Sequence, residues 1–383
     1  MRDAVVRRWV RVAGMGALIL AGAAVAEENT MSSRARQPLR PPALRTGDTI
    51  GIVAPGHPLD RDRIDRAVRR LEGMGFRACV IGDVYTRRGY LAATDAERAQ
   101  AIMAAFLDPQ VKAVFCGTGG YGTTRILERL DFDAIRRNPK ILLGFSDVTA
   151  LHLAIHKETG QVTFHGPNLM WGLGSEDRNL TPFASVHLWR NLCDSNTLES
   201  IVARSAKPDS SEPVPGFEAL TRPTPDNLLR YDLSLCEPET LAPTTIRPGR
   251  ARGRLVGGNL SLVCALMGTP WQIETKGRIL FLEDVGEQPY RIDRFLRQLK
   301  HAGLLDGVAG VILGRWHKCV PDNPEKSMTL DEVFADYFSD APYPVVAQFP
   351  VGHVRDNATL PLGVLAELDA TALTLTLLEP AVE

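Results

Sequence analysis

Ser146 lies where the sequence changes from the pattern of a buried strand to that of a helix. Residues 141–143 are apolar, Gly144 is small, and a plausible helix begins directly after the serine. A corner of this kind holds a hydroxyl clear of the sheet edge and aims backbone N–H groups at an anion that develops beside it. The position of Ser146 is therefore typical of a nucleophilic serine.

A glycine-rich turn precedes this serine in the chain. Residues 117–122 contain four glycines and lie between an apolar strand and an expected helix. Glycine lets a backbone approach a ligand closely and present its N–H groups. The spacing does not match the G-x-G-x-x-G pattern of dinucleotide sites, and the turn is not in the first strand-helix unit, which argues against nucleotide binding. N–H groups of this turn and of Asp147 would instead form an oxyanion hole beside Ser146.

A nucleophilic serine needs a general base, and histidine is the usual one. His152 and His156 lie one turn apart after Ser146 and are expected to form a helix face. His165 follows a short strand and either lines a cleft or packs in the core. His353 follows a glycine that ends an apolar run, which places its imidazole at the end of an element. Element-end histidines are also common at surfaces, so spacing alone leaves the choice of base open.

An acid must orient that base, and two carboxylates stand directly after an apolar run. Residues 279–282 are apolar and are followed by Glu283 and Asp284. A carboxylate at the end of a buried strand is costly to charge unless it has a partner, and a histidine would be a suitable one. The alternative is that both acids begin a loop and cap a helix at 289–299.

Regular alternation of elements before and around the serine predicts an α/β fold. The expected strands are 49–54, 77–81, 113–116 and 141–143, and the expected helices are 60–74, 95–107 and 123–130. Strands interleaved with helices indicate a Rossmann-like parallel sheet that is covered on both faces, with a ligand crevice at the carboxyl ends of its strands. We expect this N-terminal nucleophile domain to span residues 44–171.

The rest of the chain divides into a weakly patterned segment and a second lobe. Residues 172–250 are rich in proline and serine, which indicates a linker or insertion. Residues 251–383 carry apolar strands at 279–282, 308–313 and within 364–378, which predicts a C-terminal α/β, β-rich lobe. Polar, proline-containing residues 27–43 are expected to form a linker before the first domain.

Residues 1–26 have the pattern of a signal peptide. Four arginines precede an uncharged stretch that ends in Ala24-Val25-Ala26. That order is typical of an export signal with a small-x-small cleavage site. The uncharged stretch is shorter than the ~20 residues that cross a bilayer, so no stable membrane insertion is expected after cleavage. Arg7 and Arg8 resemble a twin-arginine signal, and an uncleaved anchor remains the alternative.

Composition and cysteine spacing exclude several classes of partner. The chain is 44% hydrophobic and 23% charged, with a formal net charge of -1, so it does not resemble a nucleic-acid-binding protein. Its six cysteines have no metal-ligand spacing, so metal binding is not expected. We expect no other cofactor. We expect Cys116 and Cys264 to be small core residues.

Six motifs follow one another in a fixed order along the chain. They are Gly119-Gly120-Tyr121-Gly122, Gly144-Phe145-Ser146-Asp147, His165-Gly166-Pro167, Gly257-Gly258-Asn259, Leu282-Glu283-Asp284 with Tyr290-Arg291-Ile292-Asp293-Arg294, and Gly352-His353. Together they resemble the LD-carboxypeptidases of serine peptidase family S66, the muramoyltetrapeptide carboxypeptidases. The resemblance runs from about residue 44 to the C-terminus and is weakest near 172–250.

This resemblance implies specific roles for five residues. Ser146 would be the nucleophile, His353 the base and Glu283 the orienting acid, in a metal-independent triad that joins the two lobes. The N–H groups of Gly120 and Asp147 would form the oxyanion hole. The implied reaction is hydrolysis of the L,D-peptide bond that releases the C-terminal D-alanine from murein tetrapeptides.

Substrate recognition is less well defined than catalysis. A carboxypeptidase must bind a terminal carboxylate, for which Arg125, Arg315 and Arg355 are candidates. Tyr121 and Asn259, which lie in the family-like motifs, are further candidates for substrate contacts. Thr118 departs from similar proteins, which often have an arginine before the paired glycines, and the loss of that charge is expected to alter substrate contacts.

Two other functions stay open from the sequence. A relative with the same fold cleaves peptide-nucleotide antibiotics for self-immunity, and a non-catalytic exported protein would bind murein peptides without cutting them. The signal-like N-terminus predicts a periplasmic or exported protein, whereas familiar members of the family act in the cytoplasm. A homodimer is a further expectation from the resemblance.

Overall fold

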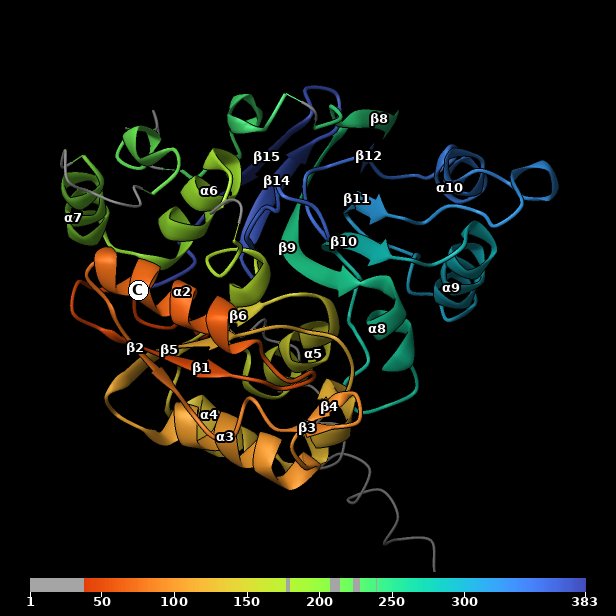
Figure 1. Ribbon diagram of the computed structural model, residues 1–383. Coiled ribbons are helices and arrows are strands. Elements are labelled where there is room, and N and C mark those ends of the chain that lie inside the picture. The colour runs from red at the N-terminus through yellow and green to blue at the C-terminus, as the bar shows by residue number, and fades with distance from the viewer. Residues whose placement is uncertain (1–37, 177–179, 207–213, 223–227, 239) are drawn as a thin grey trace, which may run out of the picture. The chain divides into compact units, whose positions relative to one another are not determined.

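The computed structural model describes residues 38–176, 180–206, 214–222, 228–238 and 240–383 (Figure 1). Residues 38–383 form one compact unit. The predicted signal peptide and most of the predicted 27–43 linker lie outside the described residues. Among the helices that are described, none is long and apolar enough to cross a membrane.

Two sheets provide the framework of this unit. The first is six-stranded, with β7, β6, β5, β1 and β2 parallel and β13 antiparallel at one edge. Its strands are β1 (Thr49–Val53), β2 (Arg77–Val80), β5 (Val111–Cys116), β6 (Ile141–Gly144), β7 (Thr163–His165) and β13 (Leu360–Leu362). This sheet confirms the expected parallel arrangement.

The second sheet is mixed and seven-stranded, in the order β15-β14-β9-β10-β11-β12-β8. Strands β9 to β12 are parallel, β8 and β14 pair antiparallel to this group, and β15 pairs antiparallel to β14. Its strands are β8 (Thr244–Arg247), β9 (Arg250–Asn259), β10 (Arg278–Val285), β11 (Gly310–His317), β12 (Val345–Ala347), β14 (Leu365–Asp369) and β15 (Thr374–Leu377). A short hairpin of β3 (Arg87–Arg88) and β4 (Leu91–Ala92) stands apart from both sheets.

Helices cover the two sheets. Figure 1 shows α2 on one side of the first sheet and α3 and α4 on the other, as expected for a parallel sheet. Helix α5 contacts both β7 and β9, so it packs between the sheets. The helices are α2 (Arg61–Gly73), α3 (Asp95–Leu107), α4 (Phe132–Arg137), α5 (Thr149–Thr159), α6 (Pro182–Leu192), α7 (Ser195–Ser205), α8 (Leu260–Ala265), α9 (Pro289–His301) and α10 (Leu330–Phe338).

Local sequence explains where several helices begin. Thr94 and Glu97 form a capping box at the start of α3, with each side chain bonded to the other residue's backbone N–H. Residues Thr123–Arg129, in contrast, form a 3₁₀ helix, although a regular helix was expected there. The hydroxyl of Thr123 bonds to Asp147, and no side chain caps this segment. Two adjacent β-branched residues at its start also lower its helical propensity.

The segment expected to be a linker or insertion, 172–250, contains packed elements. It includes α6, α7 and β8, and Trp189 on α6 is fully buried. Its proline- and serine-rich part falls mainly at 207–213, outside the described residues. At the start of the unit, Leu39 bridges to Gln161, so packing begins before residue 44.

Four histidines, three of them buried and His156 half-buried, predict a marked loss of stability in mild acid. Burial lowers the pKa of His152, His156 and His187 to about 4, and that of His165 well below its usual value. An unfolded histidine has a pKa near ~6.5, so between these values the unfolded chain binds more protons than the folded one. Each of the first three should therefore contribute about 2 kcal/mol less stability at pH 5 than at pH 7.

Urea unfolding at the two pH values measures this loss. His187 has a matched control in His301, which is exposed near the end of α9. We expect His187→Gln to reduce the pH dependence and His301→Gln to leave it unchanged. Equal unfolding free energies at pH 7 and pH 5 would contradict the prediction.

Candidate active site

Ser146, His353 and Glu283 form a continuous hydrogen-bonded chain. The Oγ of Ser146 lies 3.0 Å from Nε2 of His353, and Nδ1 of the same imidazole lies 2.7 Å from Oε2 of Glu283. The Glu283 side chain is fully buried. Because Nδ1 donates to the carboxylate, Nε2 is left with its lone pair toward the serine hydroxyl. This is the arrangement that lets a histidine take the proton of a serine.

The backbone at Ser146 has the sharp bend expected of a nucleophile. Strand β6 ends at Gly144, Phe145 is extended, and a 3₁₀ turn over Ser146–Val148 leads into α5. Ser146 has φ +66°, in the left-handed region that residues other than glycine rarely adopt. Strain of this kind is retained where the surrounding structure requires it, commonly at functional sites.

Glu283 reaches the site from β10, which is an interior strand of the second sheet. The next residue, Asp284, instead accepts hydrogen bonds from Nδ2 of Asn259 and from the N–H and hydroxyl of Ser261. Successive residues on a strand point to opposite faces, so only one of the two acids can meet His353. Neither acid caps α9, whose N-cap residue Gln288 makes no side-chain cap bond.

Gly352 sets the position of His353. It has φ +121°, and a Cβ built on it would lie 2.8 Å from Oε2 of Glu283. Its N–H donates to Oδ1 of Asn357 at 2.9 Å. A glycine is therefore needed here for both the backbone conformation and the approach of the carboxylate.

The glycine-rich turn lies directly against the serine. A Cβ on Gly119 would come within 3.0 Å of the Ser146 Cβ and 3.1 Å of the Asp147 nitrogen. Gly120 has φ +96°, and a Cβ there would collide with the ring of His57. The turn thus packs against Ser146 and the Asp147 amide, and its role as an oxyanion hole stays a prediction.

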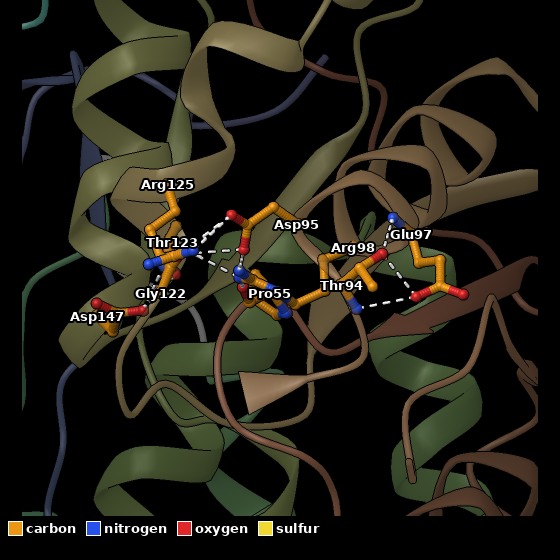
Figure 2. A network of polar contacts seen from close by, with 9 residues as sticks. All are labelled: Pro55, Thr94, Asp95, Glu97, Arg98, Gly122, Thr123, Arg125 and Asp147. Atoms are coloured by element: carbon orange, nitrogen blue, oxygen red, sulfur yellow. Dashed lines mark hydrogen bonds and ion pairs between the residues drawn. The ribbon is translucent and has the colours of Figure 1, made fainter. Parts of the chain in front are cut away.

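A network of polar contacts holds this turn in place (Figure 2). Arg98 is buried, donates to the carbonyls of Pro55 and Gly122, and pairs with Asp95. The guanidinium therefore fixes the turn from α3. Its bonds to carbonyl oxygens link two loops that lie on either side of it.

The carboxylate of Asp147 is a second anchor in Figure 2. It accepts from the N–H of Thr123 at 2.9 Å and from its hydroxyl at 2.5 Å. Burial raises the pKa of Asp147, although the bonds from Thr123 oppose this. The side chain of Asp147 is thus used to support the turn, and its backbone N–H lies beside Ser146.

The arginines proposed to bind a carboxylate already have protein partners. Arg125 forms a two-pronged ion pair with Asp95, and Arg355 forms one with Glu237. Arg315 is buried and donates to Oε1 of Gln348 and to the carbonyl of Leu241. Burial lowers the pKa of Arg315. A substrate would have to compete with or extend these contacts.

Asn259 and Tyr121 differ in their access to a ligand. Asn259 is buried, its Oδ1 caps α8 at the Leu262 N–H, and its Nδ2 binds Asp284. Asn259 is therefore used to hold Asp284 and the start of α8 in place. Tyr121 is exposed and packs edge-on against Tyr90, with ring centroids 5.3 Å apart. Its role in substrate binding remains a prediction.

The other histidines that were considered are structural. His152 bonds the carbonyl of Gly144 and His156 bonds that of Gln161. His165 is fully buried and lies edge-on to Phe145 and Phe281. It therefore packs behind the triad and does not contact Ser146 through a hydrogen bond.

Two neighbouring residues, Trp171 and Arg63, were missed from the sequence. Trp171 is exposed, its indole N–H donates to the hydroxyl of Thr118 at 3.2 Å, and the guanidinium of Arg63 lies over its ring at 4.5 Å. No periodic pattern marks a lone tryptophan in a loop. Its position just after the His165-Gly166-Pro167 motif was the only available signal.

The cysteines and acids show no metal-ligand cluster. Within the described parts of the chain, no group of three or more His, Cys, Asp or Glu side chains is arranged to hold a metal ion. All six cysteines are described as free thiols. Burial raises the pKa of Cys264 to about 12, which keeps this thiol protonated.

Comparisons with known proteins match both halves of the site. Residues 50–166 match the LD-carboxypeptidase N-terminal domain, and residues 252–368 match the LD-carboxypeptidase C-terminal domain. The chain is 38% identical over 336 residues to the probable murein peptide carboxypeptidase of Bacillus subtilis (strain 168), covering 88% of this chain and 93% of that protein.

More distant relatives share the fold. The microcin C7 self-immunity protein MccF of Escherichia coli is 30% identical, over 87% of this chain and 93% of its own. A solved structure of MccF in complex with glutamyl sulfamoyl guanosine has a TM-score of 0.72 at 27% identity, covering 90% of this chain and all of that one. The chain belongs to the LD-carboxypeptidase family, peptidase family S66.

Proposed function

We propose that this protein is a serine carboxypeptidase that releases the C-terminal D-alanine from murein tetrapeptides. The observation that carries the proposal is the hydrogen-bonded chain from Ser146 through His353 to the buried Glu283. The name of the 38%-identical relative, a probable murein peptide carboxypeptidase, supports the substrate class.

The first half of the reaction forms an acyl-enzyme. The Oγ of Ser146 attacks the carbonyl carbon before D-alanine while Nε2 of His353 takes the hydroxyl proton. The tetrahedral oxyanion accepts hydrogen bonds from the N–H groups of Gly120 and Asp147. The C–N bond then breaks, His353 returns the proton to the leaving amine, and D-alanine departs.

The second half releases the shortened peptide. Water attacks the ester on Ser146 and gives its proton to His353, which then protonates the serine oxygen as the ester bond breaks. Glu283 keeps Nδ1 protonated throughout and stabilises the imidazolium that forms at each step. Its location in the second sheet makes catalysis depend on both sheets together.

Incubation with defined murein peptides tests the proposal. We expect mass spectrometry to show loss of one alanine from the tetrapeptide and no cleavage of the tripeptide. Because no step uses a metal, the rate with EDTA should equal the rate without it. An intact tetrapeptide after prolonged incubation, with or without EDTA, would contradict the proposed activity.

The similarity to MccF supports a second candidate, the hydrolysis of peptide-nucleotide compounds. The relative was solved with glutamyl sulfamoyl guanosine. Comparing kcat/KM for the tetrapeptide with that for an aminoacyl-sulfamoyl adenosine separates the two activities. Tight binding of murein peptide without any product would instead favour a non-catalytic binding protein.

We propose export to the periplasm from residues 1–26, which lie outside the described residues. Cell fractionation and N-terminal sequencing of the mature protein test this. A mature N-terminus at Glu27 would support cleavage after Ala26, whereas intact Met1 in a cytoplasmic fraction would oppose it. A homodimer is also proposed, and sedimentation equilibrium measures it.

A further inference from the structure

Trp171 is an unusually exposed aromatic residue that is held in a fixed position. The residue is 62% exposed, although most tryptophans are largely buried. The indole N–H is bonded to Thr118, one residue before the Gly119 that packs on Ser146. The guanidinium of Arg63 lies over the ring at 4.5 Å. These contacts keep a flat apolar surface near the nucleophile.

The loop that carries Trp171 is fastened to α2 by a row of arginines. Arg63, Arg66 and Arg70 stand three or four residues apart, so they share one face of the helix. They donate to backbone carbonyls of the loop, at Met170, Gly174, and Leu173 with Ser175 respectively. The N–H of Met170 also bonds the carbonyl of Gly117. The loop is therefore anchored to both α2 and the glycine-rich turn.

Trp171 forms one wall of a cavity of about 230 Å³ that adjoins the triad. Phe145, next to Ser146, and Val354, next to His353, line the same cavity. The remaining lining residues are Pro167, Ser175, Leu180, Thr181, Arg355 and Asn357. A cavity below the ~300 Å³ of ordinary ligand sites suits a single side chain.

The described lining residues of this cavity provide apolar surface and one charged side chain. Phe145, Pro167, Trp171 and Val354 provide apolar surface, and Arg355 is the only charged residue among the described lining residues. Its partner Glu237 accepts two hydrogen bonds from it at 2.8 and 3.0 Å. Arg355 is still 46% exposed, so a second carboxylate can approach it.

We propose that this cavity binds the side chain of the residue whose carbonyl Ser146 attacks, and that it selects an aliphatic stem ending in a carboxylate. The inference rests on the proposed function and adds the residues of this chain that recognise one substrate position. The stem packs against Trp171, and the carboxylate meets Arg355. The third residue of a murein tetrapeptide fits better when it is diaminopimelate, whose side chain ends in a carboxylate beside an ammonium group, than when it is lysine, which ends in an ammonium group alone.

The test compares tetrapeptides that contain either diaminopimelate or lysine at the third position. We expect wild-type kcat/KM to favour the diaminopimelate peptide. Arg355→Gln should reduce this preference about tenfold, and Arg355→Lys should restore part of it. Trp171→Ala should lower kcat/KM for both peptides by about tenfold to a hundredfold, whereas Trp171→Phe should retain most of it.

Tyr290 provides a matched control. It is an exposed aromatic ring with an arginine, Arg294, over it at 5.3 Å, but it lines a separate cavity on α9. Tyr290→Ala should leave both kcat/KM values unchanged. Equal effects of Tyr290→Ala and Trp171→Ala, or a preference that is unaltered in Arg355→Gln, would overturn the inference.

Binding to a variant that cannot turn over separates this inference from the proposed function. Calorimetry with Ser146→Ala measures the Kd of each tetrapeptide, and Ser146→Ala/Trp171→Ala should bind about tenfold or more weakly. If wild type releases no D-alanine, the proposed function fails, while the binding comparison still decides the inference. An unchanged Kd would reject the cavity as a substrate site.

Discussion

Ser146→Ala is expected to lower the rate of D-alanine release by on the order of 10⁴-fold or more. The variant removes the only hydroxyl placed 3.0 Å from Nε2 of His353 among the described contacts. The fold should be unaffected, because alanine removes one oxygen and relieves no packing. The measurement is single-turnover release of D-alanine, followed by mass spectrometry.

Two further variants show whether the triad acts as a unit. His353→Ala should lose about as much activity as Ser146→Ala, and the double variant should lose little more, because members of a triad are strongly non-additive. Ser327→Ala changes a half-buried serine at the end of the 3₁₀ turn Pro324–Lys326, outside the triad, and should behave as wild type. Release by Ser146→Ala within tenfold of wild type would show that another group is the nucleophile.

Glu283→Gln is expected to lower the rate about 10³- to 10⁴-fold while preserving shape. The glutamine amide can donate where the carboxylate only accepts, so it no longer fixes the Nδ1 proton of His353. It also lacks the charge that stabilises the imidazolium. Because Glu283 is fully buried, water cannot replace that charge.

Asp284→Asn is the matched control on the same strand. Its carboxylate accepts hydrogen bonds from Asn259 and Ser261 and, among the described contacts, none from His353. We expect it to reduce the unfolding free energy while kcat stays within about tenfold of wild type. If the two variants lost activity equally, Glu283 would have no special role in orienting the base.

Much of the fold could be predicted from the sequence because its elements have strong local patterns. Strand β1 and helices α2 and α3 begin and end within a residue or two of the expected positions. Around 123–130, the low helical propensity of two β-branched residues acts together with a tertiary contact, because Thr123 bonds Asp147 across the turn. Such a contact has no local sequence pattern.

The segment at 172–250 shows a second limit of local patterns. Helix α6 is buried almost completely, so its sequence lacks the polar face by which surface helices are recognised. Strand β13 joins the first sheet although it lies far along the chain, next to β7. Pairing of this kind depends on the path of the whole chain and not on the strand's own sequence.

The candidate site was predictable in part. The bend at Ser146 and the apolar run before Glu283 are local features of the sequence. Their contacts with His353 are not local, because Ser146 and His353 lie 207 residues apart in the chain. Spacing alone left both the base and the acid open, and the resemblance to a family chose between them. The alternation of β10 then explains why Glu283, and not Asp284, meets the imidazole.

Residues whose roles depend on contacts between distant segments could not be predicted from the sequence. Trp171 and Arg63 lie more than a hundred positions apart in the chain, and their contact exists only because the loop after β7 packs on α2. Arg98 likewise lies on α3 but fixes a turn after β5. The spacing of apolar residues predicts which side chains are buried and whether a segment is a helix or a strand. It does not predict which side chain connects two loops.

Labelling with a serine-directed phosphonate tests most directly whether Ser146 is activated by His353 and Glu283. After peptide mapping by mass spectrometry, we predict one adduct on Ser146 in wild type, none in Ser146→Ala, and labelling slowed by orders of magnitude in His353→Ala. An adduct at another serine, or equally fast labelling of Ser146 in His353→Ala, would contradict the proposed catalytic triad.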